Sequence, residues 1–193
     1  MRPIKTKGMG QAQPANPPIQ QNSSPLPSGV LGNEKTIKFM VKLARLRGSN
    51  PYVRDVARAI ILEARTADHD FAAEAKAIGA WVQKNIHYLR DVAGEELVID
   101  PLTLLEQASR GEAAGDCDDM ALLSATLLLA SGSHPYFRAI RYFDTAGPYD
   151  HIYTVVYEAD ATGAEQRLVL DCIIKDQSIG TEVNQESGKE YPV

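Results

Sequence analysis

The chain has 193 residues, a formal net charge of −5 and 44% hydrophobic residues. This length accommodates one domain with an appendage and is short for two full domains. The longest strongly apolar stretch, ALLSATLLLA at 121–130, is about half as long as a membrane span, and no secretory signal is visible. We therefore expect a protein without a membrane span that is made in the cytoplasm.

Positive charge is concentrated towards the N-terminus. Residues 1–47 contain eight Lys and Arg and one acidic residue, which gives +7, so the remaining 12 basic and 24 acidic residues give −12. The acidic body argues against a nucleic-acid-binding domain. A basic arm on an acidic body suggests that the arm docks on an acidic surface, either its own or a partner's.

Residues 1–33 contain PANPP and QQNSSPLPSG and almost no apolar periodicity. This composition predicts an extended arm, rich in Pro and Gln, that cannot form a core of its own. The arm carries Arg2, Lys5 and Lys7, which we expect to bind protein partners, as in a multi-subunit assembly.

Two helices are predicted in residues 34–66, which form an N-terminal helical segment. Asn33 is a candidate N-cap of the first helix and Gly48 ends it, whereas Asn50 caps the second, which runs to about Ala64. Their apolar stripes are Ile37, Met40, Val41 and Ala44 in the first, and Val53, Val56, Ala57, Ile60 and Ile61 in the second.

Residues 67–176 are the predicted main domain. Asp68 or Asp70 opens its first helix, a short helix begins at Pro101, and a strongly apolar helix runs from Cys117 to about Ala130. The inward face of the first of these helices is Phe71, Ala75, Ile78, Val82 and Ile86.

Three β-branched and aromatic runs follow, at 136–143, 151–158 and 166–174, and they predict antiparallel strands. The tail, residues 177–193, is polar and is predicted to be a loop. Helices followed by strands predict an α+β fold in which helices pack on one antiparallel sheet.

The segment GDCDD at 115–119 carries the most informative chemistry. Cys117 lies in the first turn of an apolar helix, where unpaired backbone N–H groups favour a thiolate and can hold an oxyanion. Gly115 leaves room for a substrate, whereas Asp118 and Asp119 oppose thiolate formation. His151 opens a strand 34 residues later and Asp171 closes the next strand, so a thiol, a base and an orienting carboxylate follow in order.

A family resemblance is carried by GDCDDMALLSATLLLASG, HIYTVVYE and LVLDC, with WVQKNIHYLRD and DPLTLLEQASRGEAAGDC upstream. These segments resemble the transglutaminase-like superfamily, which has a papain-type fold, and the match covers roughly residues 70–175. The resemblance implies that Cys117 is the nucleophile, His151 the base and Asp171 the orienting residue. The chain is also similar in size and plan to short members of the superfamily encoded by tailed phages and prophages.

Two functions of different class follow. The first is thiol-dependent acyl transfer at an amide bond, by a cysteine peptidase, amidase or transglutaminase-like enzyme without a cofactor, acting on a peptide or peptidoglycan-type substrate. Gln107 is a candidate oxyanion donor, and the alternative is a solvent-facing glutamine. The second function is a structural subunit of an assembly, such as a phage tail or baseplate, with incorporation into the virion.

The two cysteines are not expected to form a disulfide. Cys172 follows Asp171 on a strand, so its side chain should point the opposite way, into the core. Cys117, His151 and Asp171 could together bind zinc, but no paired spacing such as HxxxH or CxxC supports a metal site, and we predict none.

Overall fold

A computed structural model of the protein describes residues 30–91, 97–142, 149–175, 178–182, 185 and 187–193. Residues 1–29, which hold most of the predicted arm with Arg2, Lys5 and Lys7, lie outside the described residues. The helices are α1 (Val30–Gly48), α2 (Pro51–Ala64), α3 (Phe71–Asn85), α4 (Pro101–Arg110) and α5 (Cys117–Ser131). The strands are β1 (His87–Tyr88), β2 (Ala114–Gly115), β3 (Tyr136–Arg141), β4 (His151–Ala159), β5 (Glu165–Leu170) and β6 (Ser187–Pro192).

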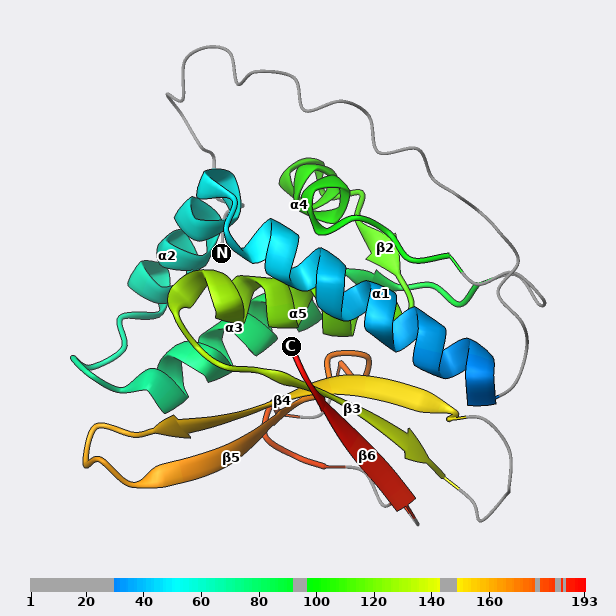
Figure 1. Ribbon diagram of the computed structural model, residues 1–193. Coiled ribbons are helices and arrows are strands. Elements are labelled where there is room, and N and C mark those ends of the chain that lie inside the picture. The colour runs from blue at the N-terminus through cyan, green and yellow to red at the C-terminus, as the bar shows by residue number, and fades with distance from the viewer. Residues whose placement is uncertain (1–29, 92–96, 143–148, 176–177, 183–184, 186) are drawn as a thin grey trace.

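The described elements form two layers, with the helices on one face of a sheet (Figure 1). The sheet is antiparallel, with the strand order β5-β4-β3-β6, and β1 and β2 form a separate short parallel pair. This arrangement confirms the predicted α+β class. Among the described residues, no helix is both long enough and apolar enough to cross a membrane.

Helix α5 lies at the centre of the helical layer, in contact with α1, α2, α3 and β4. Its ten residues from Asp119 to Leu128 are all buried, because the helix is apolar on every side. The two hydroxyls in this stretch, on Ser124 and Thr126, donate to the carbonyls of Met120 and Leu122 at 2.8 and 2.7 Å, so neither is left unsatisfied. The element that carries Cys117 is therefore held from all directions.

The helix ends follow the predicted capping residues, with one exception. Asn50 and Asp70 each accept a backbone N–H at 2.9 Å as N-caps of α2 and α3, which decides between Asp68 and Asp70. Helix α1 begins at Val30, so the prediction that Asn33 caps it is wrong. Asn33 lies within the first turn of the helix, and the arm boundary predicted at residue 33 therefore falls inside α1.

Helix α3 buries the predicted apolar face except at its first residue. Ala75, Ile78 and Val82 are buried, whereas the Phe71 side chain is 45% exposed, so its predicted inward position is wrong. Phe71 begins the helix at the margin of the core, and the adjacent Ala72 is the residue that is buried there. A small side chain at this position lets α3 approach its neighbours closely.

Alternation along β4 divides its side chains between two faces of the sheet. Ile152 and Val156 pack with helical residues, and the Thr154 hydroxyl donates to the Ala121 carbonyl of α5 at 2.8 Å. His151 and Tyr153 occupy the alternate positions and point to the outer face, away from α5. Residues of both faces are buried, so the sheet has a packed outer surface as well.

The strand boundaries differ from the predicted ones in three places. Strand β3 ends at Arg141 and β5 ends at Leu170, so the predicted extensions to 143 and 174 are too long where they can be followed. The tail, predicted to be a loop, contributes β6, which pairs with β3 from Tyr136↔Pro192 to Arg141↔Ser187. On the outer face β6 places Glu190, which pairs with Arg138 of β3 and Arg167 of β5, whereas Tyr191 packs against the helical side.

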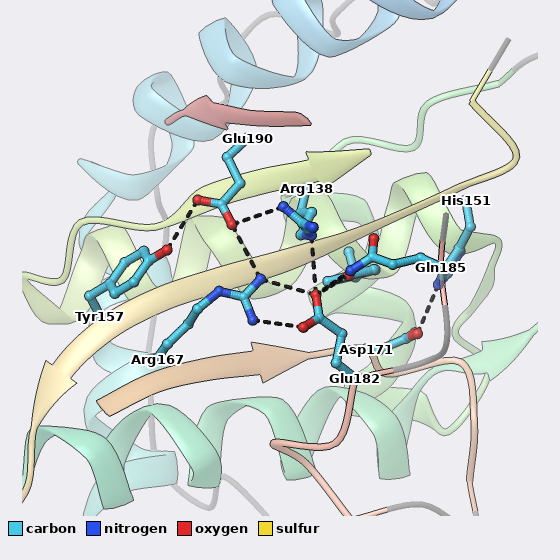
Figure 2. Close-up of polar contacts among 9 residues, drawn as sticks. Arg138, His151, Tyr157, Arg167, Asp171, Glu182, Gln185 and Glu190 are labelled. Carbon is cyan, nitrogen blue, oxygen red and sulfur yellow. Dashed lines mark hydrogen bonds and ion pairs between the residues drawn. The ribbon is translucent and has the colours of Figure 1, made fainter. Parts of the chain in front are cut away.

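A network of ion pairs covers the outer face of the sheet (Figure 2). Arg138 and Arg167 both pair with Glu182 and with Glu190, at 2.9 to 3.3 Å. The Tyr153 hydroxyl also donates to Glu182, at 2.6 Å. These contacts fasten the segment around Glu182 and strand β6 across the face on which His151 lies.

Candidate active site

Cys117 is the first residue of α5 and is partly buried. Asp116 caps the helix by accepting the backbone N–H groups of Asp118 and Asp119, and the Asp119 carboxylate accepts the N–H of Asp116 in return. This capping box fixes the backbone on both sides of Cys117. The predicted position of a thiol at the start of an apolar helix is confirmed.

His151 and Asp171 are brought together on the outer face of the sheet. The imidazole Nε2 lies 2.9 Å from the Asp171 Oδ2, and both side chains are more than nine-tenths buried (Figure 2). Asp171 follows β5 directly and His151 begins the neighbouring β4, as the antiparallel order of the strands predicted. This contact leaves Nδ1 as the ring nitrogen available to take a proton from elsewhere.

Cys117 reaches the same strand from the other face of the sheet. Its side chain packs against the cluster that contains Ile152, the residue after His151, and the Ile152 backbone N–H acts to lower the pKa of the thiol. Among the described residues, no hydrogen bond joins the Cys117 thiol to the His151 imidazole. Cys117 and His151 therefore both lie at the start of β4, but within the described part of the chain no hydrogen bond joins the sulfur to the imidazole.

The thiol instead contacts the neighbouring carboxylate. Cys117 Sγ donates to Asp118 Oδ1 at 3.4 Å. Burial, followed by the charges of Asp118 and Asp116, raises the pKa of Cys117 well above its ordinary value. The predicted opposition of Asp118 to a thiolate thus has a structural basis, whereas the second carboxylate that raises the pKa of Cys117 is Asp116 and not the predicted Asp119.

Asp119 is buried behind the nucleophile and joins two loops. Its carboxylate accepts the N–H of Ile99 at 2.7 Å as well as that of Asp116 at 3.2 Å. A Cβ at Gly115 would lie 2.7 Å from the Asp119 Cβ and Oδ2, so only glycine leaves room for this carboxylate. The glycine predicted to admit a substrate therefore has a packing role as well.

Two tyrosines that the sequence analysis did not single out lie at the site. The Tyr142 ring is nearly parallel to the His151 ring, at 10° with 5.8 Å between centroids. Burial, then the charges of Asp171 and Cys117, raises the pKa of Tyr142 to about 12. Tyr88 is next to Gly115 in the β1–β2 pair, and burial and the Cys117 charge raise its pKa. Both are aromatic residues at strand ends, which by pattern alone resemble core residues.

The predictions for Gln107 and Cys172 have different outcomes. Gln107 lies partly buried in α4, and no hydrogen bond of its side chain to Cys117 is found among the described residues, so its oxyanion role stays a prediction. Cys172 is buried and reduced, and its sulfur lies 3.5 Å from Ser124 Oγ and from the Gly79 carbonyl, as predicted for a core residue.

Asp116, Cys117 and Asp118 offer ligand atoms within 4.8 Å of one another, which is the spacing of a metal site. Asp116, however, already accepts two backbone N–H groups as the N-cap, and Asp118 accepts a hydrogen bond from the Cys117 thiol. The three are consecutive residues of one helix start, an arrangement that capping explains without a metal.

Comparison of the chain with known proteins adds no assignment, since no protein-family model and no curated protein sequence matches it.

Proposed function

We propose that the protein is a thiol-dependent acyl transferase or hydrolase that acts at an amide bond. The observation that carries this proposal is the buried His151–Asp171 pair, at 2.9 Å, at the start of β4, where Cys117 packs against the cluster that contains the next residue, Ile152. A buried imidazole held by a carboxylate is the arrangement that activates a nucleophile in covalent acyl chemistry. The resemblance of GDCDD, HIYTVVYE and LVLDC to the transglutaminase-like superfamily supports the same reading.

The reaction proceeds through a thioester. His151 Nδ1 takes the Cys117 proton, the sulfur attacks the amide carbonyl, and the backbone N–H groups at the start of α5 stabilise the oxyanion. The C–N bond then breaks as His151 returns the proton to the leaving amine. Water or a second amine attacks the thioester, which releases a carboxylic acid or a new amide and restores the thiol.

The first step requires the Cys117 side chain to exchange its partner. In the structure the thiol donates to Asp118 and lies on the other face of β4 from His151, so both the Cys117 side chain and the start of β4 have to change conformation before proton transfer to His151. Hydrogen bonds of catalytic groups are often long or absent without substrate and form in the complex. We infer that substrate binding displaces the thiol from Asp118.

Alkylation with iodoacetamide, followed by mass spectrometry of each cysteine, tests the proposal. Cys117 should react selectively, while Cys172 serves as the internal control because burial raises the pKa of its thiol to about 12. His151→Gln should slow the reaction of Cys117, because the substituted side chain cannot accept the thiol proton. Equal reaction rates in the wild type and in His151→Gln would overturn the triad.

Trapping the acyl-enzyme tests the class of substrate. A glutaminyl peptide with a fluorescent amine, and a peptidoglycan-type peptide with water as acceptor, are the two amide substrates to compare. An adduct on Cys117 that disappears in Cys117→Ala and persists in Cys172→Ala supports the reaction. Failure of both substrates, with Cys117 no more reactive than Cys172, refutes it.

A second candidate function is an assembly subunit in which the same site is inert, for example a component of a phage tail or baseplate. The observation that favours it is the contact of the thiol with Asp118, together with the raised pKa of Cys117. Selective, His151-dependent alkylation separates the two functions, since an inert subunit does not show it.

A further inference from the structure

The exposed side of α1 carries an unusual combination of charge and apolar surface. Its solvent-facing positions recur every three or four residues and include no acidic residue after Glu34, which pairs with Lys189 at 3.8 Å. We define these positions as the basic face: Lys35, Lys38, Phe39, Lys42, Arg45 and Leu46.

The described part of the chain supplies no acidic partner to the basic face. Among the described residues, none of its four cations forms an ion pair, and like charges three or four residues apart destabilise a helix. Phe39 is 50% exposed and Leu46 58% exposed, between these cations. Large apolar side chains surrounded by unpaired charge are typical of a docking surface.

The complementary surface lies elsewhere on the same chain, where α3 begins beside the β4–β5 hairpin. We define it as the acidic tip: Asp70, Glu74 and Glu158, with Phe71 exposed among them. Burial, then the charges of Glu158 and Asp70, raises the pKa of Glu74, and His69 acts in the opposite direction. The acidic tip thus accumulates negative charge that a cationic partner would relieve.

The two surfaces are on different parts of the molecule. Figure 1 shows the start of α3 and the β4–β5 hairpin together at the left, whereas α1 begins at the right, in blue, and runs above α5 towards α2. Since the two surfaces do not contact each other within one chain, they can pair only between chains. Each presents one charge sign around an exposed phenylalanine, so they match in both charge and apolar character.

We propose that the basic face of one copy docks on the acidic tip of a second copy, so that the chain assembles head to tail. Different patches of each copy make such an interface, so it propagates into a ring or a filament rather than closing as a symmetric dimer. The inference is independent of the thiol chemistry, because neither surface contains Cys117, His151 or Asp171.

Sedimentation of the full chain over a range of concentration and ionic strength tests the proposal. At low salt the mass should rise above the 21.1 kDa of one chain as concentration increases, and high salt should reverse this. The paired variants Lys38→Glu/Lys42→Glu and Glu74→Lys/Glu158→Lys should each remain monomeric. Mixing the two paired variants should restore association, because each variant keeps the wild-type surface that the other has lost.

A matched control makes the result specific. Arg54→Glu/Arg58→Glu changes the same charge, on exposed α2 positions with the same four-residue spacing, and should assemble like the wild type. A wild type that stays monomeric at low salt, or a mixture that fails to associate, overturns the proposal. It is equally overturned if Lys38→Glu/Lys42→Glu leaves self-association intact and instead abolishes binding to vesicles of phosphatidylcholine and phosphatidylserine, which would make the basic face a membrane-binding surface.

Discussion

Replacing Arg47 with Met removes a guanidinium that joins the end of α1 to the start of α4. Arg47 donates to Asp100 from Nε at 2.9 and 3.1 Å and from Nη2 at 2.7 Å, and the two side chains are only 9% and 17% exposed. Breaking such a buried pair from one side costs about 3–5 kcal/mol, because the remaining charge stays buried without a partner. For a chain of this size, the melting temperature should fall by roughly 6–20 °C.

Asp100 also caps α4, so the choice of variants has to separate the loss of this cap from the loss of the ion pair. Its Oδ1 caps α4 by accepting the N–H of Leu102 at 2.9 Å, so Asp100→Asn is preferable to alanine because it retains an acceptor. Urea denaturation of Arg47→Met, Asp100→Asn and the double variant gives the coupling free energy of the pair. We expect the double variant to be less destabilised than the sum of the two single changes by about 2 kcal/mol or more.

The exposed pairs of Arg110 provide the comparison. Arg110 contacts Glu106 and Glu112 at 2.8 and 2.9 Å, but its side chain is 48% exposed, so Arg110→Met should change the unfolding free energy far less than Arg47→Met does. A coupling between Arg47 and Asp100 no larger than the effect of Arg110→Met would refute the argument that burial makes their pair matter.

Three further predictions concern the surroundings of Cys117. Asp118→Asn should lower the pKa of Cys117 and speed its alkylation at neutral pH, and an unchanged rate would mean that Asp118 does not hold the thiol neutral. Gly115→Ala should reduce the unfolding free energy in urea by about 1–3 kcal/mol, because its Cβ would meet the Asp119 side chain; a cost under about 0.5 kcal/mol would contradict this contact. Burial raises the pKa of Asp119 to about 7, so the folded state holds this proton more tightly than the unfolded chain. The unfolding free energy should therefore decrease as the pH rises from about 4 to about 7. In Asp119→Asn this decrease should be smaller, and identical pH profiles of the two proteins in urea would be evidence against the assignment.

The helices were predictable from sequence because capping residues and apolar periodicity agree in them. Asn50, Asp70 and Asp100 each precede a periodic apolar pattern, and each caps the helix that follows. The start of α1 was missed because Asn33 resembles a cap, although a cap requires the chain to leave the helix before it. Phe71 was misplaced because periodicity assigns a face to a residue but does not say how far the core extends.

The sheet was less predictable because its order depends on contacts distant in sequence. The tail that forms β6 contains Gly188, Lys189 and Glu190 and has no apolar alternation, so its pairing with β3 is supported by the ion pairs of Glu190 with Arg138 and Arg167. Such partners cannot be recognised before the strands are in place.

The candidate site was predictable in composition but not in geometry. The chain order of Cys117, His151 and Asp171 suggested all three, and strand neighbourhood was sufficient to predict the His151–Asp171 contact. Strand β4 is apolar on both faces, so the sequence does not reveal which of His151 and Ile152 faces α5 and which faces the outer side of the sheet. The absence of a Cys117–His151 hydrogen bond among the described residues follows from that alternation.

The burial of α5 restricts the direction from which anything can reach Cys117. Helices α1, α2 and α3 and strand β4 cover the sides of α5, and every residue from Asp119 to Leu128 is buried. A molecule bound for the sulfur therefore has to arrive along the helix axis, at the end bordered by Tyr88 and Tyr142. An extended chain can present a carbonyl in this end-on approach, whereas a broad globular surface would meet the rim of the site first.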